Sequence, residues 1–143
     1  MFMGEHSHTI DAKGRLIIPA KFREELGNRF ILTQGMDNAL TIYPMEQWEK
    51  FQEQLDSLPF TSKEARAFRR FFTARATECE LDKQGRILIP SELRGYAGLV
   101  KDVVLTGNIS NIEVWSKEHW DEVSAVDDMD AIAEKMQEMG IGF

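Results

Sequence analysis

Two aspartate–arginine pairs stand out among the residues that could do chemistry. Asp11 precedes Arg15 by four positions, and Asp82 precedes Arg86 by the same spacing. A carboxylate that holds an arginine in place leaves part of the planar guanidinium free for a second acceptor, such as a phosphate or the edge of guanine. The spacing alone is also compatible with an ion pair that only fixes a turn. The pattern therefore predicts either a surface that recognises anions and bases or a structural pair.

The two pairs belong to an internal repeat with an offset of 71 residues. Segment 10–23, IDAKGRLIIPAKFR, returns as segment 81–94, LDKQGRILIPSELR. The shared positions are an acid, a glycine, an arginine, an isoleucine, a proline and a second arginine, which are mainly turn residues and charges. One chain therefore looks like a fused dimer. Each half is small, so we expect the two halves to share one core and to exchange hairpins across a pseudo-twofold axis.

Each repeat is expected to begin with a hairpin that leads into a short helix. Segments 6–11 and 15–18 predict two strands, and Gly14 suits the left-handed position of the loop between them. Pro19 fits the first turn of a helix that Gly27 ends. The hairpin loop would then place the carboxylate and the arginine of the pair opposite each other.

The remaining elements are expected in the same order in both halves. After the first helix, strands at 30–34 and 39–43 precede an amphipathic helix from Pro44. Thr61 and Glu64 resemble the capping box of a basic helix. For the second half the sequence predicts strands at 77–81 and 86–89 joined through Gly85, a helix from Pro90, strands at 103–106 and 112–115, and a helix from Ser116.

The predicted organisation has four parts. These are a first repeat at 1–60, a connecting basic helix at 61–75, a second repeat at 76–126 and an acidic tail at 127–143. With 43% hydrophobic and 29% charged residues the composition is that of an ordinary soluble domain with enough apolar material for a single core. The strands and helices expected above make its fold class α+β. No apolar run is long enough for a signal peptide or a membrane span, so we expect a cytoplasmic protein without membrane contact.

Charge is unevenly distributed along the chain. The formal net charge is −7, but residues 117–143 carry two lysines against eight acids, which leaves 15 basic and 16 acidic residues in segment 1–116. A nearly neutral body argues against non-specific attachment to polyanions and leaves room for a focused basic patch.

The candidate DNA-binding residues are the basic side chains in and after the two motifs. The first half is expected to dominate, because Glu92 replaces Lys21 in the second half. The basic helix at 61–75 is a further candidate, although a solvated helix or a subunit contact explains it equally well. The predicted DNA contacts are Lys13, Arg15, Lys21, Arg23, Arg86 and Arg94, with Asp11, Gly14, Asp82 and Gly85 orienting the motifs.

The other reactive side chains do not indicate a catalytic or metal-binding site. His6 and His8 share a face of a predicted strand, but no third metal ligand has convincing spacing. Cys79 is the single cysteine, so it forms no internal disulfide and is expected to be a small buried residue. Trp48 and Trp120 occupy matching helix positions and are expected in the core. We therefore predict no catalytic site, no metal site and no cofactor, and the protein is not expected to be an enzyme.

Both repeats, together with the opening segment MFMGE, closely resemble the MraZ family of bacterial transcriptional regulators, within the wider AbrB/SpoVT-like swapped-hairpin class. The resemblance covers essentially the whole chain. It implies two tandem AbrB-like repeats that form one pseudo-twofold, β-barrel-like core with flanking helices. It also implies a nucleoid-associated repressor that binds direct repeats of double-stranded promoter DNA upstream of the division and cell-wall gene cluster, beginning with its own gene.

The same resemblance implies a ring-shaped homo-oligomer, an octamer or larger, in which neighbouring subunits bind tandem boxes. Two other classes of protein stay open. An antitoxin of the swapped-hairpin class would need a peptide that inhibits a toxin, and segment 127–143 is the candidate for it. A ring-forming scaffold without DNA affinity is the other alternative.

Overall fold

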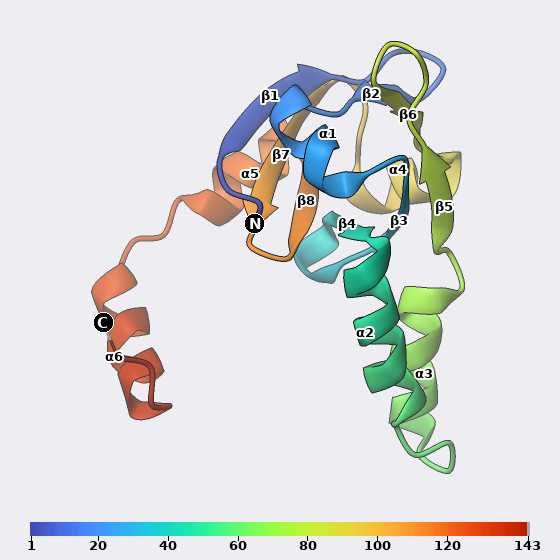
Figure 1. The fold of residues 1–143 in the computed structure, drawn as a ribbon. Helices are drawn as coiled ribbons and strands as arrows, with labels where there is room; N and C mark the ends of the chain where they lie inside the picture. Colours follow the sequence, from blue (N-terminus) through green and yellow to red (C-terminus); the bar gives the residue numbers. More distant parts are fainter. Residues whose placement is uncertain (143) are drawn as a thin grey trace.

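The computed structural model describes residues 1–142 as an α+β fold (Figure 1). Phe143, the last residue of the predicted tail at 127–143, lies outside the described residues. The elements in chain order are β1 (Glu5–Thr9), β2 (Arg15–Ile17), α1 (Ala20–Leu26), β3 (Arg29–Gln34), the 3₁₀ helix η1 (Met36–Asn38), β4 (Leu40–Pro44), α2 (Met45–Asp56), α3 (Lys63–Thr73), β5 (Thr77–Glu80), β6 (Arg86–Leu88), α4 (Ser91–Ala97), β7 (Asp102–Asn108), β8 (Asn111–Ser116), α5 (Lys117–Ser124) and α6 (Met129–Glu138).

The first strand of each repeat pairs with the other repeat. The main sheet has the order β1-β7-β8-β4-β3-β5, with every pair antiparallel, and β2 pairs with β6 in a separate two-stranded ribbon. Thus β1 joins β7 of the second half, whereas β5 joins β3 of the first half. The predicted exchange of hairpins across the two repeats is confirmed.

The same topology corrects the expected strand pairing inside each hairpin. Segments 6–11 and 15–18 were expected to pair with each other, but within the described residues they share no ladder. Instead, β1 makes five register pairs with β7. A neighbouring strand of the other half offers β1 a longer partner than the three-residue β2 can, so the backbone hydrogen bonds form between repeats.

The strand registers place a pseudo-twofold axis between equivalent residues. In the ribbon, Leu16 lies opposite Ile87, its counterpart in the repeat. In the main sheet, Thr41 lies opposite Glu113 where β4 pairs with β8. Both central pairs join corresponding positions of the two halves, so one chain has the symmetry of a dimer.

The two halves share one hydrophobic core, as their small size requires. Phe22 and Leu26 of α1 are buried in it, and the ribbon contributes its inward-facing side chains Leu16 and Ile87. The ribbon thereby covers the open side of the curved sheet and gives the core its barrel-like closure (Figure 1). The core also contains Ile18, Phe30, Leu32, Leu40, Ile42, Ile89, Leu93, Leu105, Ile112 and Val114.

The predicted helices form, with one change at a helix start. The N-cap of α3 is Ser62, whose hydroxyl accepts the backbone N–H of Ala65 at 3.1 Å, and not Thr61 as the capping-box pattern suggests. Trp48 is buried as expected. Trp120 is half-buried beside Trp115, and its indole N–H donates to Glu5 Oε1 at 2.9 Å.

Three helices lie outside the barrel-like body. Helices α2 and α3 project side by side at the end away from the β2–β6 ribbon, and α6 lies apart from the body beyond α5 (Figure 1). Helix α6 lies within the segment 127–143 that the sequence analysis describes as an acidic tail. Among the described residues, no helix is both long and apolar enough to cross a membrane.

Candidate nucleic-acid interface

The segment from Asp11 to Arg15 is a closed turn, here called the first turn. Backbone hydrogen bonds run from Asp11 N–H to the Arg15 carbonyl (3.0 Å) and from Gly14 N–H to the Asp11 carbonyl (2.9 Å). Asp11 Oδ1 accepts the backbone N–H groups of Lys13 (3.0 Å) and Arg15 (2.8 Å). Gly14 has a φ of +85°, which a residue without Cβ adopts easily. Aspartate and glycine thus fix the turn by local chemistry.

The second carboxylate oxygen of Asp11 orients the arginine side chain. Arg15 Nε donates to Asp11 Oδ2 at 2.7 Å, and the Arg15 side chain is 36% exposed. Within the described residues neither terminal nitrogen of this guanidinium makes a hydrogen bond, so both remain available to an outside acceptor. The pKa of Asp11 lies below its usual value, mainly because the backbone N–H of Arg15 donates to it and also because of the Arg15 side chain. The carboxylate therefore stays charged near neutral pH.

Residues Asp82 to Arg86, here called the second turn, repeat this geometry. Arg86 Nε donates to Asp82 Oδ2 at 2.8 Å, and Asp82 Oδ1 accepts the backbone N–H groups of Gln84 (2.9 Å) and Arg86 (2.8 Å). Gly85 has a φ of +76°. The pKa of Asp82 is lowered, again mainly by the backbone N–H of its arginine. Arg86 is 24% exposed, so it is less accessible than its counterpart in the first turn.

The β2–β6 ribbon brings both arginines onto one exposed surface. Because side chains alternate along a strand, Leu16 and Ile87 face the core while their neighbours face outward. Opposite Arg15 lies Leu88, which is 60% exposed, and opposite Arg86 lies Ile17, which is 38% exposed. We call these four residues, Arg15, Ile17, Arg86 and Leu88, the outer ribbon face.

Sequence reasoning missed Ile17 and Leu88 as functional candidates. Both occupy outward positions of their strands, on the same face of the ribbon as the two motif arginines. The signal was present in the sequence: each follows its motif arginine by two residues, so that residue and the arginine share a face of the strand.

The other predicted contacts are distributed more widely. Lys13 lies in the first turn. Lys21 is exposed on α1, with its Nζ close to Gly4 at the start of β1. Arg23 and Arg94 are half-buried, and each packs against the turn of the opposite repeat: Arg23 against Gly85 and Arg94 against Gly14. Each of these two arginines thus lies beside the turn of the other repeat, although in sequence it follows the turn of its own.

The basic helix α3 lies away from the two turns. The turns meet at one end of the body, whereas α2 and α3 project from the opposite end (Figure 1). Arg69 pairs with Asp56 of α2, and Arg75 is bound by Gln34 and Glu92. Two arginines of the basic segment 61–75, one on α3 and one just after it, are therefore paired with carboxylates of the chain itself.

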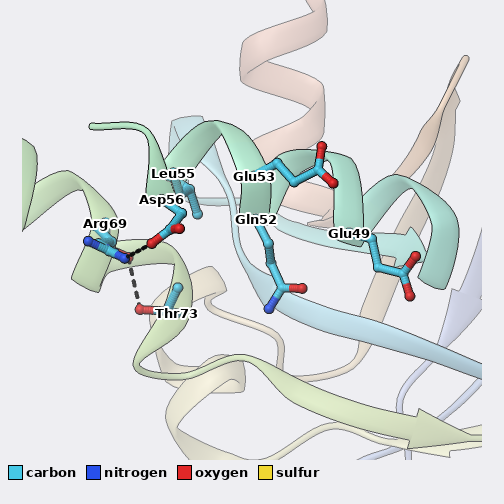
Figure 2. A pocket seen from close by; sticks show the side chains of 7 residues that line it. All are labelled: Glu49, Gln52, Glu53, Leu55, Asp56, Arg69 and Thr73. Carbon is cyan, nitrogen blue, oxygen red and sulfur yellow. Dashed lines mark hydrogen bonds and ion pairs between the residues drawn. The ribbon is translucent and has the colours of Figure 1, made fainter. Parts of the chain in front are cut away.

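A groove runs between α2 and α3, and its lining is acidic. Figure 2 shows Glu49, Glu53 and Asp56 along it, with Arg69 reaching Asp56. The Thr73 hydroxyl, which also lines the groove, donates to the Arg69 carbonyl at 3.0 Å within α3. Three carboxylates would repel a phosphate backbone, so this groove is a poor candidate for binding nucleic acid.

The remaining reactive side chains lie in structural positions. Cys79 is buried, and burial raises the pKa of its thiol to about 12, so it is not a ready nucleophile. The His6 ring packs edge-on against Phe22, and the pKa of His8 is lowered mainly by burial. Among residues 1–142, no three His, Cys, Asp or Glu side chains are grouped to hold a metal ion.

Comparisons with known proteins agree on one family. The family model for the MraZ protein, which its description likens to antitoxins, matches twice, at residues 1–71 and 72–139. A transcriptional regulator MraZ of Lachnoclostridium phytofermentans is 56% identical over 143 residues, with all of both chains covered. Those of Moorella thermoacetica and Desulfitobacterium hafniense are 56% and 57% identical, covering 99% of this chain and 100% of theirs. With two matched repeats and full-length relatives at this identity, the chain belongs to the MraZ family.

Proposed function

We propose that this protein is a sequence-specific DNA-binding transcriptional regulator that contacts promoter DNA with its two turns and the outer ribbon face. The observation that carries the proposal is that two carboxylate-oriented arginines share one exposed, two-stranded ribbon. The major groove of DNA, about 12 Å wide, admits such a ribbon. The names of the full-length relatives support a regulator of transcription.

The residues of this surface have distinct proposed roles. Arg15 and Arg86 present their terminal nitrogens to guanine edges, where an arginine makes two parallel hydrogen bonds. Ile17 and Leu88 contact the methyl groups of thymine. Lys13 and Lys21 hold phosphates and so set the register without selecting a sequence. The first turn dominates, because Arg15 is more exposed than Arg86.

The physiological target follows from the family resemblance. The proposed operator is a set of direct repeats upstream of the division and cell-wall gene cluster, and the protein represses that cluster and its own gene while associated with the nucleoid. Boxes spaced by about ten base pairs would keep successive subunits on one side of the duplex. A ring of eight or more chains would supply affinity by multivalency, which a body with 15 basic and 16 acidic residues in segment 1–116 needs.

Fluorescence anisotropy tests the proposal with a labelled duplex from the region upstream of the protein's own gene. A scrambled duplex is the control, and both are measured at two salt concentrations. Arg15→Ala is expected to abolish selective binding. Lys21→Ala is expected to weaken binding to both duplexes and to reduce the slope of log K against log salt by about 1, because one phosphate contact is lost.

Arg29→Ala is the matched control, since Arg29 is an exposed arginine of β3 that pairs with Glu78 and belongs neither to the two turns nor to the outer ribbon face. It is expected to bind like the unchanged protein. Equal, weak binding of both duplexes by all variants would overturn the proposal and favour a ring-forming scaffold. Light scattering of the purified protein decides separately whether a ring forms.

An antitoxin-like role is the second candidate, favoured by the family description and by the exposed helix α6. Met129, Ile132 and Met136 lie along one side of α6 and are all exposed. The test compares the full chain with a chain that ends at residue 126. If a protein that arrests growth is bound and neutralised by the full chain only, the antitoxin role is supported. If both chains regulate transcription equally and neutralise nothing, it is rejected.

A further inference from the structure

We infer that Arg23 and Arg94 are positioning residues that act across the two repeats. Arg94 braces the first turn and Arg23 braces the second, so each turn is completed by the opposite half of the chain. This inference rests on the proposed function for its consequence in DNA binding. We call the packing of Arg94 against Gly14, and of Arg23 against Gly85, the brace. The brace is a property of the protein alone, and it can be tested without DNA.

The guanidinium groups occupy the space that a side chain would need at the two turn glycines. A Cβ atom on Gly14 would fall on Arg94 Nη1 and lie 2.8 Å from its Cζ. A Cβ atom on Gly85 would clash with Arg23 Nη1 and lie 2.5 Å from its Cζ. Glycine is therefore needed for a second reason besides its positive φ: it lets an arginine from the other repeat lie against the turn.

Backbone hydrogen bonds tie the same partners together. Ile89 N–H donates to the Gly14 carbonyl at 2.8 Å, and Ile18 N–H donates to the Gly85 carbonyl at 2.9 Å. Both isoleucines are fully buried. Each turn therefore rests on the end of a strand of the other repeat, and the arginine follows that strand end by five residues.

The brace is best defined at Arg23. Its Nε donates to the Ile18 carbonyl at 2.7 Å, and Ile18 is the residue whose N–H holds Gly85. The backbone of one residue, Ile18, thus holds both the arginine and the turn that it covers. Arg94 takes the equivalent place against Gly14.

The crossed arrangement orders each turn before any DNA is bound. Arg94 of the second repeat lies against Gly14 of the first turn, whose own side chains Lys13 and Arg15 are proposed DNA contacts. Because folding has already ordered the turn, less conformational entropy is lost when DNA binds. The alternative role, in which Arg23 and Arg94 hold phosphates directly, makes different predictions.

Amide hydrogen exchange on the full-length protein without DNA tests the brace. In Arg94→Ala, exchange at Gly14 and Arg15 is expected to rise about tenfold or more while Gly85 and Arg86 keep their rates, because only the first turn is released. Arg23→Ala is expected to give the reverse pattern. A pattern confined to the same repeat, or no change at either turn, would overturn the inference.

Gly14→Ala is the reciprocal variant, because its added carbon displaces the Arg94 guanidinium. It is expected to release the first turn as Arg94→Ala does. Gly27→Ala is its matched control: Gly27 also has a positive φ, of 73°, but a Cβ there meets nothing within 4 Å. If both alanines lowered the free energy of unfolding equally, backbone strain at a positive φ would explain the effect of Gly14→Ala and the brace would be rejected. These two variants also decide the question if Arg94→Ala does not fold.

DNA binding separates a brace from a phosphate contact. If Arg94 acts through the turn, Arg94→Ala reduces the ratio of operator to scrambled binding and leaves the salt slope unchanged, and Arg94→Lys does not restore that ratio because lysine lacks the planar group. If Arg94 holds a phosphate, the slope falls by about 1 and lysine restores binding. If no variant binds DNA selectively, the proposed function fails while the exchange result still decides the brace.

Discussion

At the level of single residues, one carboxylate in each turn binds both the backbone of the turn and the side chain of its arginine. Asp11 Oδ1 accepts two backbone N–H groups and so closes the turn, while Oδ2 holds Arg15 Nε. An exposed ion pair by itself contributes little to stability. Here the same pair limits the motion of the arginine, and under the proposed function its main effect is to orient the guanidinium for DNA.

The lowered pKa of Asp11 and Asp82 predicts how the turns respond to pH. A carboxyl group whose folded pKa is depressed stabilises the fold above its unfolded pKa, here the ordinary 3.8, and this contribution is lost as the pH falls through the folded pKa. Both turns should therefore stay closed from pH 8 to about pH 5 and open only in stronger acid. The NMR shifts of the two carboxyl carbons measure this, and an inflection between pH 5 and 7 would contradict it.

At the level of elements, burial explains why the β2–β6 ribbon forms. Strands of three residues are too short to pair stably in water. The inward side chains Leu16 and Ile87 are almost completely buried, so the ribbon is held by the core beneath it. The outward positions are then free to carry charge and exposed aliphatic groups without loss of stability.

Two leucines on the same ribbon test whether its inward side chains support the fold while its outward side chains do not. Leu16→Ala is expected to reduce the free energy of unfolding by about 2–5 kcal/mol, as for other fully buried leucines. Leu88→Ala, at a position 60% exposed, is expected to change it by less than about 0.5 kcal/mol. Urea unfolding at neutral pH gives both values. Under the proposed function Leu88→Ala also weakens selective DNA binding, and a large loss of stability in this variant would show that its side chain supports the fold.

At the level of the whole molecule, the exchange of strands makes the two repeats interdependent. The β1 strand has its ladder partner in the second half, and β3 has one of its partners there. The turn contacts cross between halves in the same way. A substitution in one repeat can therefore alter the turn that the other repeat contributes to the proposed DNA-binding surface.

A fragment of residues 1–75 tests this interdependence. As a monomer it would leave β1 unpaired and expose core side chains such as Leu16, so we expect no cooperative unfolding transition. Circular dichroism with urea, combined with light scattering for the oligomeric state, gives the answer. A monomeric fragment that unfolds cooperatively would contradict the shared core. A folded homodimer would agree with it, since the second copy can replace the missing half.

The sequence by itself determined the local structure of the chain, namely its turns and helix starts. The duplicated Asp, Gly, Arg and Pro positions predicted both turns and the helices that follow, because a left-handed glycine, an aspartate-closed turn and a proline at a helix start depend on near neighbours. The alternation of apolar residues predicted the strands, and the repeat predicted the exchange of hairpins.

Tertiary structure decided which residues of the two halves meet. The sequence places Arg23 eight residues after Arg15, yet it packs on Gly85, and β1 pairs with β7 although β2 follows it directly. The outer ribbon face could not be predicted from the sequence either, because Arg15 and Leu88 become neighbours only through the β2–β6 register. Such contacts depend on the burial of one shared core, and that burial is a property of the whole chain that no local pattern of residues contains.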